Sequence, residues 1–499
     1  MSENRIPENK MGVMPVGKLL LNMALPMIIS MLVQALYNVV DSIYISRVSE
    51  NAVTALSLAF PIQNLQIGAA VGIGVGVNAL LSKSLGEKNH EMTNFAAGNG
   101  LLLAAICTVI FMIFGVVGVR PYYMMQNTSI ETAEAGIAYT SICCLLTGGI
   151  FLEILFERLL QATGRTFHTM ITQGVGAIAN IVLDPVFIFG VEALGIFMEI
   201  LGERLLQATG RTVHTMITQS TGAIINIILD PILIHGWFGV PAMGVAGAAV
   251  ATVIGQWIGA LVGFYFNAKH NPDVQFGGRY LKLEKKTIGA ILTVGIPSVV
   301  MNSIGSVMNF GMNQILQGFA ETATSVFGIY FKLQSFFFMP LFGLNNATIS
   351  IIAFNYGARK PQRITKTLKL SVCGALGLMT AGWAAFQFAP DLLLGMFNPS
   401  PAFLEMGRSC LRTISWSFPL AAVCISLGAS FQALGNGIYS TITSVCRQLV
   451  VLLPVAYLMS LSGDVHSVWL AYPIAEVASG TVTAFFFARI YRQKIKPLF

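Results

Sequence analysis

Three aspartates stand inside long apolar segments, where a carboxylate is costly and usually functional. Asp41 lies near the end of the first segment, and Asp184 and Asp230 each precede a proline in two similar stretches. A carboxylate in a low-dielectric environment resists ionisation, so it can take up and release a proton, and its oxygens can also ligate Na⁺. These residue types indicate a cation site.

Each aspartate has an asparagine within one helical turn before it. Asn38 is three residues before Asp41, and Asn180 and Asn226 are each four residues before the other two aspartates, so each pair shares a helix face. A proline after the aspartate also leaves backbone groups that a bound ion can satisfy. The alternative for Asp41 is a helix-end aspartate facing water, because Arg47 follows closely.

The composition requires a membrane around these residues. Of 499 residues, 55% are hydrophobic and 10% are charged, against roughly 25% charged in a soluble protein. At about 20 apolar residues a span, plus loops, the length predicts roughly 12 to 14 helices. We expect an all-α polytopic membrane protein without a soluble catalytic domain.

Apolar runs between polar segments predict thirteen helices and one ambiguous segment, 191–208, which carries Glu192, Glu199, Glu203 and Arg204. The expected helices are 17–44, 52–82, 93–119, 133–160, 168–190, 213–236, 243–267, 287–317, 321–355, 364–390, 404–433, 438–461 and 466–491.

Basic residues explain the net charge of +7. They cluster before the first apolar segment, after the second, in the loops around 269–286 and 359–369, and at 489–496. This pattern is typical of cytoplasmic loops under the positive-inside rule. It predicts a multi-pass protein of the cell inner (cytoplasmic) membrane and disfavours nucleic-acid binding.

A tandem duplication occupies the middle of the chain. Residues 149–194 recur as 195–240, with about 32 of 46 positions identical. Because a single extra span would invert every later loop, an even number of added spans is favoured. Either 191–208 crosses the membrane as a short helix, giving about 14 spans, or one copy stays at the surface, leaving 12.

A second, older repeat spans the chain. Pro26 and Pro297, Gly86 and Gly357, and Gln161 and Gln432 stand in similar contexts at a constant offset of 271. The chain is therefore expected to contain two parallel six-helix lobes, 1–276 and 277–499, with the tandem unit in the first. Two such lobes facing each other suit a central cavity and alternating access.

Several stretches resemble the multidrug and toxic compound extrusion (MATE) family of efflux transporters. They are QALYNVVDSIYIS at 34–46, ALSLAFPIQ at 55–63, LLQATGR in both tandem copies, GAIINIILDP at 222–231, AMGVAGAAVATVIGQ at 242–256 and NYGARK at 355–360. The resemblance covers nearly the whole chain. It implies a monomeric antiporter that exports amphipathic, often cationic drugs from the cytoplasm by alternating access, in exchange for H⁺ or Na⁺. The chain departs from the family in length by one tandem unit.

The resemblance also implies a first-lobe cation site on the first and fifth helices. It would combine Asp41 and Asn38 with either Asn180 and Asp184 or Asn226 and Asp230. The second tandem copy runs into the sixth helix as in the family, which slightly favours Asp230.

The aligned helices of the second lobe contain no acid in the matching positions, so the coupling site is expected in the first lobe only. The residues proposed for the substrate cavity are Gln34, Tyr37, Gln63, Lys332, Arg447 and Glu476. The last three are intramembrane charges that could pair with one another, although snorkelling to a membrane surface is an alternative for Arg447. Glu153 and Glu157, beside Arg158, are interpreted as a structural ion pair at a helix end.

Other chemistry has little support in the sequence. The seven cysteines show no CxxC spacing, the six histidines show no metal-ligand spacing, and no nucleotide-binding motif or catalytic triad appears. We therefore expect no enzyme activity, no cofactor, no nucleic-acid or nucleotide partner and no metal other than Na⁺ at the coupling site. The lipid bilayer and small-molecule drugs are the expected partners. A flippase for a lipid-linked saccharide precursor is the alternative function.

Overall fold

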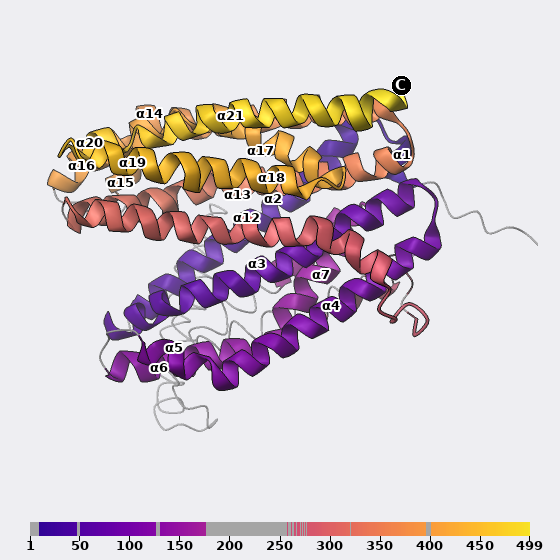
Figure 1. The fold of residues 1–499 in the computed structure, drawn as a ribbon, viewed down its shortest axis with the longest axis horizontal. Coiled ribbons are helices and arrows are strands. Elements are labelled where there is room, and N and C mark those ends of the chain that lie inside the picture. The colour runs from indigo at the N-terminus through magenta and orange to yellow at the C-terminus, as the bar shows by residue number, and fades with distance from the viewer. Residues whose placement is uncertain are drawn as a thin grey trace, which may run out of the picture.

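The structure is a computed structural model in which every regular element of the described residues is a helix (Figure 1). The described residues are 9–46, 50–125, 130–175, 277–319, 321–395 and 401–499, together with 257, 261, 264, 265, 267–269, 271, 273 and 275. Within these ranges the side chains of 30, 33–57, 131, 132, 135, 317, 321, 322, 325 and 402 lie outside this description. The all-α class is confirmed.

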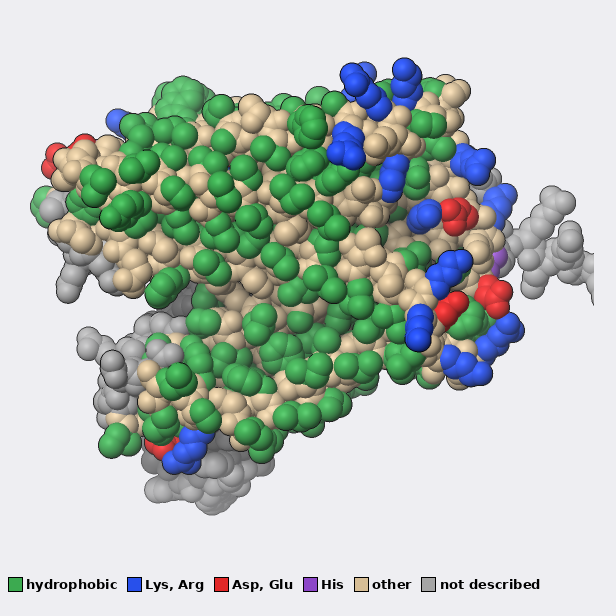
Figure 2. Space-filling view, in the orientation of Figure 1, with side chains coloured by type: hydrophobic (Ala, Val, Ile, Leu, Met, Phe, Trp, Pro, Cys, Tyr) green, Lys and Arg blue, Asp and Glu red, His purple; other side chains and the backbone are tan. Residues whose placement is uncertain are grey.

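The described helices fit a membrane-spanning protein. Seven are long and apolar enough to cross a bilayer, and two bent helix pairs are candidates for one broken span each. Large apolar side chains such as Leu21 and Val116 are each 70% exposed, and apolar side chains cover much of the face that Figure 2 shows. Lipid would solvate this surface, so the prediction of a multi-pass membrane protein is confirmed.

The described part of each half of the chain contains both long and short helices. The first half contains α1 (Lys10–Val13), α2 (Val16–Ser46), α3 (Glu50–Gly86), α4 (His90–Val117), α5 (Val119–Met124), α6 (Ile130–Leu145) and α7 (Gly148–Ala162). A further helix occupies 166–175. The second half contains α12 (Lys285–Gln317), α13 (Glu321–Gly357), α14 (Pro361–Phe388), α15 (Pro390–Gly395), α16 (Pro401–Ser415), α17 (Phe418–Ala433), α18 (Gly437–Val445), the π-helix η1 (Cys446–Leu452), α19 (Leu453–Ser460), α20 (Val465–Val468), α21 (Ala471–Ile490), the π-helix η2 (Tyr491–Ile495) and the 3₁₀-helix η3 (Lys496–Leu498).

Local sequence explains where several helices begin and break. Asn89 caps α4 by accepting a hydrogen bond from the Met92 amide, and Pro361 starts α14 at a position that needs no amide donor. Pro454 removes a donor that the preceding turn would need, and the π-helix η1 lies directly before it.

Two helices predicted as continuous are bent. The expected helix 133–160 divides into α6 and α7 at an angle of 49°, and the expected helix 404–433 divides into α16 and α17 at 46°. Gly148 and Gly149 follow the first break, and Pro419 follows the second. Paired glycines and proline both weaken a helix at such positions. A prediction from apolar residues alone therefore made each of these helices too long.

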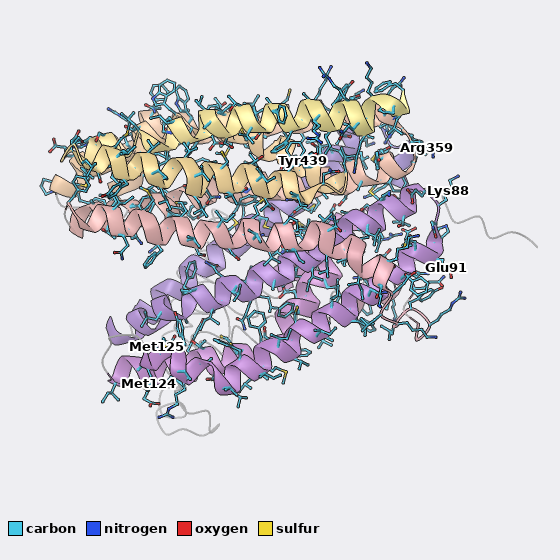
Figure 3. The ribbon with its side chains drawn as sticks, viewed as in Figure 1. Lys88, Glu91, Met124, Met125, Arg359 and Tyr439 are labelled. Carbon is cyan, nitrogen blue, oxygen red and sulfur yellow. The ribbon has the colours of Figure 1, made fainter. Side chains whose placement is uncertain are left out.

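Helices of the two halves form two bundles that converge at one end. The first bundle holds α3–α7 and 166–175, and the second holds α12–α21 (Figure 1). Lys88 and Arg359 lie at the converging end, whereas Met124 and Met125 lie at the opposite end, where the bundles diverge (Figure 3). Most basic side chains gather at the converging end, hereafter the basic end (Figure 2).

Contacts between the bundles concentrate on four helices. α3 packs along α12, and both α2 and α3 pack on α13. Near the basic end α3 and α13 touch at Gly86 and Gly357: a Cβ atom on Gly86 would lie 1.9 Å from the Phe354 carbonyl oxygen, and one on Gly357 would lie 2.0 Å from the Lys83 carbonyl oxygen. Only glycine permits this approach of two backbones.

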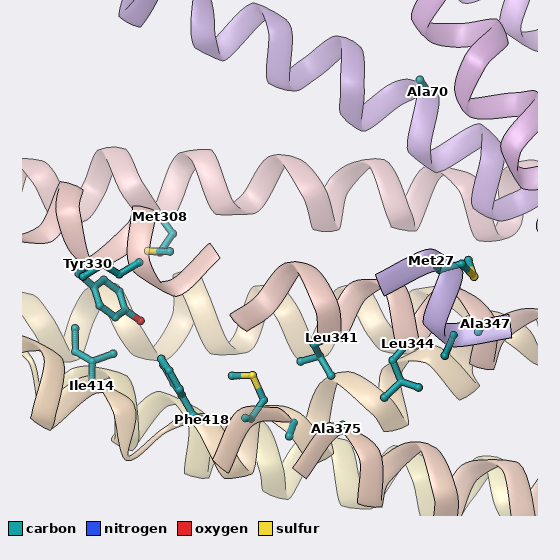
Figure 4. Close-up of a cluster of buried hydrophobic side chains, with 14 of the residues drawn as sticks. Met27, Ala70, Met308, Tyr330, Leu341, Leu344, Ala347, Ala375, Ile414 and Phe418 are labelled. Atoms are coloured by element: carbon teal, nitrogen blue, oxygen red, sulfur yellow. The ribbon is translucent and has the colours of Figure 1, made fainter. Parts of the chain in front are cut away.

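Apolar packing inside the second bundle holds its helices around aromatic residues. Tyr330 of α13 and Phe418 of α17 are fully buried, and Leu341 and Leu344 continue the same cluster along α13 (Figure 4). Phe338 contacts Phe418 edge to face, with ring centroids 5.4 Å apart. This core gives a rigid wall to the space between the bundles.

Candidate functional site

A cavity of about 880 Å³ lies between the two bundles. α3, α6 and α7 line it from one side, and α12, α13, α17, α18, η1 and α21 line it from the other. Figure 2 shows that the surface is hollowed between the bundles at the end away from the basic residues. This size fits a drug-sized molecule.

Amide and hydroxyl groups give the cavity polar positions on both sides. Gln63 Nε2 of α3 donates a hydrogen bond to the Tyr139 hydroxyl of α6 at 2.9 Å, and both residues line the cavity. Asn64 Nδ2, also in the lining, donates to Ser306 Oγ of the neighbouring helix α12 at 2.8 Å, which joins the two bundles. The structure thus places the predicted residue Gln63 in the lining.

Methionine and aromatic side chains supply much of the remaining surface. Met301 and Met308 of α12 and Phe331, Phe338 and Phe342 of α13 all line the cavity. Methionine repacks around differently shaped molecules, and aromatic faces attract cations. This wall suits ligands that are flat, apolar or positively charged.

An ion pair lies on the second-bundle side of the cavity. Arg447 Nη1 of η1 is 3.4 Å from Glu476 Oε1 of α21, and their side chains are 21% and 7% exposed. Both residues line the cavity, so the expected pairing is confirmed for these two. Lys332 does not belong to this group, because its side chain is exposed and is not part of the cavity lining.

Breaking this pair should destabilise the protein. A Glu476→Ala substitution leaves Arg447 largely buried without its carboxylate, so we expect a loss of about 1–3 kcal/mol. The loss should appear as a lower thermal midpoint in detergent, and the Arg447→Ala/Glu476→Ala double variant should be more stable than additivity predicts. Additive losses would show that the pair contributes nothing.

The first-bundle side carries Glu153, Glu157 and Arg158 of α7, and here the sequence interpretation was wrong. All three line the cavity, and Glu157 and Arg158 are only 3% and 5% exposed. Among the described residues no ion pair joins Glu157 to Arg158; instead Arg158 Nη1 donates to Gln161 Oε1 at 2.9 Å. Glu153 and Glu157 both line the cavity because residues four apart share a helix face.

Gln173 completes this acidic corner and was missed by sequence reasoning. It lies on the helix 166–175, lines the cavity, and its Nε2 donates to Glu157 Oε2 at 2.9 Å. Sequence gave no signal for it, because the turn between α7 and 166–175 creates the contact. Within the described residues no cluster of three or more metal-ligating side chains occurs.

The predicted coupling residues fall largely outside the description. Asn180, Asp184, Asn226 and Asp230 lie outside the described residues, as does the tandem segment 191–208. The backbone of α2 is described through Ser46, but the side chains of Gln34, Tyr37, Asn38 and Asp41 are not. Met31 of the same helix lines the cavity one turn before this group.

The short helix α1 bridges the bundles at the basic end. Arg363 Nη2 of α14 donates to the carbonyl oxygens of Met11 and Met14 at 2.9 and 2.7 Å, and Asn355 Nδ2 donates to Met11 O at 3.2 Å. On the other side Asn9 Nδ2 donates to the Thr163 carbonyl oxygen at 3.1 Å. The segment therefore ties the two halves together where the bundles converge.

Charge around α1 strengthens this junction on the first-half side. Arg165 Nη1 is 2.5 Å from Asp273 Oδ2, and Asp273 is 8% exposed. Lys10 Nζ donates to Asn22 Oδ1 at 2.8 Å, and burial together with the positive charge of Arg165 lowers the pKa of Lys10.

Loss of the Arg363 contacts should loosen the basic end. For Arg363→Ala we expect a cost of about 1.5–3 kcal/mol to this closed arrangement, the range for hydrogen bonds to a charged group. The measurement is hydrogen exchange of the α1 amides, which should become faster. Lys366→Ala on the same helix is the control. Equal exchange rates in both variants would contradict the role of Arg363 in holding α1.

Comparison with known proteins gives the same architecture. The family model described as MatE matches residues 26–186 and 297–458. The FAD transporter of Shewanella oneidensis is 25% identical over 95% of each chain, and the multidrug export protein MepA of Staphylococcus saprophyticus is 24% identical over 93% of this chain and 92% of that one. A solved structure described as the outward-facing conformation of a multidrug resistance MATE family transporter has a TM-score of 0.82 at 22% identity, covering 99% of this chain and 98% of that chain.

Proposed function

Because the chain belongs to the MatE family, we propose that it exports amphipathic organic cations from the cytoplasm in exchange for H⁺ or Na⁺. The observation that carries this proposal is the cavity between the bundles, with its methionine and aromatic walls. Its described charged lining has three carboxylates, Glu153, Glu157 and Glu476, against two guanidinium groups, Arg158 and Arg447. This excess of acid favours positively charged ligands.

In the proposed mechanism the two lobes, 1–276 and 277–499, rock against each other as a monomer. The protein lies in the inner membrane, and its basic end faces the cytoplasm. The bundles diverge at the opposite end, so the cavity opens to the outside. Cation binding at Asp41 and Asn38, with Asp184 and Asn180 or with Asp230 and Asn226, rearranges the first lobe and releases the drug.

A drug-accumulation assay tests the proposal. Cells that produce the protein should retain less ethidium than cells without it, and collapsing the ion gradient should restore accumulation. Equal ethidium in both cells, with the protein present in the membrane, would contradict export of organic cations.

An anionic cofactor is the second candidate substrate. The relative named FAD transporter motivates it, and Arg158 and Arg447 offer guanidinium groups that suit phosphate. A binding competition distinguishes an organic cation from an anionic cofactor as substrate. FAD should displace ethidium from the purified protein only if the cavity accepts this anion.

A further inference from the structure

The side chains of Glu157 and Gln173 are hydrogen-bonded to each other, but one oxygen of each side chain accepts no hydrogen bond from the described residues. Gln173 Nε2 donates to Glu157 Oε2 at 2.9 Å. Glu157 Oε1 and Gln173 Oε1 are both buried, and neither has a hydrogen-bond partner among the residues that the structure describes. Glu157 itself is 97% buried, from its exposure of 3%, so bulk water does not solvate the bare oxygen.

One added proton would give both of these oxygens a hydrogen bond. A carboxylic acid and a primary amide can pair through two hydrogen bonds, one from the amide N–H to the acid carbonyl and one from the acid O–H to the amide oxygen. The first bond is present here. If Glu157 carries a proton on Oε1, its hydroxyl can donate to Gln173 Oε1, and both unpartnered oxygens are satisfied.

Few charged side chains lie where they could form an ion pair with Glu157. Glu153 and Arg158 are the charged neighbours on its own helix, and Arg158 is engaged by Gln161. The other acidic, basic and histidine side chains described on the packed elements are Lys83 on α3, His90 and Glu91 on α4, Lys332 on α13 and His168 on 166–175. None of these forms an ion pair with Glu157 within the described part of the chain.

We propose that Glu157 and Gln173 form a proton-binding site on the first-bundle wall of the cavity, separate from Asp41. A hydronium ion transfers its proton to Glu157 Oε1, which leaves water and a neutral acid–amide pair. Release returns the proton to water and restores the carboxylate. This role rests on the proposed antiport. Protonation of Glu157 would make the first-bundle wall of the cavity neutral, and deprotonation would make it attractive to a drug cation.

Infrared difference spectroscopy of the purified protein in lipid tests the site without requiring transport. We expect a carboxyl C=O band at low pH that disappears as pH rises and that Glu157→Gln removes. Gln173→Leu should keep the band but shift it to higher frequency, because the acid loses its amide partner. Glu203→Gln, the matching change in the second tandem copy, is the control and should leave the band intact.

Three results would overturn the proposal. These are a Glu157→Gln spectrum identical to that of the unsubstituted protein, a band lost in Glu203→Gln instead, or a Gln173→Leu band at the unsubstituted frequency. The last result remains informative if Glu157→Gln does not fold. An Asp41→Asn variant should retain the band, so failure of drug export and failure of this site are separate outcomes.

Discussion

Asp41→Asn should reduce gradient-driven drug export to the level of protein-free liposomes. Asparagine keeps the size of the side chain but can neither carry a proton nor neutralise Na⁺ with a full charge, so the first lobe would lose its proposed coupling group. Equilibrium binding of ethidium should persist, because the acids that line the described cavity remain. The measurement is ethidium transport in proteoliposomes with an imposed pH or Na⁺ gradient.

Asp391→Asn is the matched control for this loss. Asp391 is exposed and pairs with Arg408, whose hydrogen bond lowers the pKa of the carboxyl, and it is not part of the cavity lining. Its export rate should equal that of the unsubstituted protein. Full export by Asp41→Asn would remove Asp41 from the mechanism.

The same assay decides between the tandem copies. Only one of Asp184→Asn and Asp230→Asn should reproduce the Asp41→Asn loss, because the two copies cannot both occupy the place beside the first helix. Loss in both variants or in neither would contradict a single first-lobe site built from one copy.

Gly86→Ala should shift the protein away from the closed basic end. The added methyl group would lie 1.9 Å from the Phe354 carbonyl oxygen, so α3 and α13 must separate. Overpacking of this kind costs about 1–3 kcal/mol, and each 1.4 kcal/mol changes the ratio of the two arrangements about tenfold. Gly357→Ala should act alike, because its methyl group would lie 2.0 Å from the Lys83 carbonyl oxygen.

Cysteine labelling measures this shift. Ser350 is fully buried near the junction and donates to Asn78 Oδ1 at 3.0 Å, so a Ser350→Cys probe in a cysteine-free background should react with maleimide faster in Gly86→Ala. Gly377→Ala is the control, because nothing lies within 4 Å of its added Cβ atom. Equal labelling in both variants would show that the approach of Gly86 to α13 does not govern closure.

Sequence predicted the helical class because the signal for membrane helices is long and cumulative. The positions of α3, α4, α12 and α14 agree with the expected helices within a few residues. The breaks after Leu145 and Ser415 were missed, since apolar residues dominate on both sides of each break. They depend on local backbone chemistry at glycine and proline.

The site was less predictable than the fold. Arg447 and Glu476 could be matched in advance because opposite charges inside a membrane must find partners. Glu157 was misassigned because an arginine follows it in the chain, yet the side chain of Arg158 turns to Gln161. The direction of adjacent side chains on a helix differs by about 100°, so neighbours in sequence need not pair.

Transport of organic cations through this cavity under an ion gradient can be measured directly in liposomes. Purified protein in liposomes should move ethidium only when a pH or Na⁺ gradient is imposed, and an ionophore that collapses the gradient should stop the movement. Ethidium movement of equal rate without any gradient, or none under either gradient, would contradict the account.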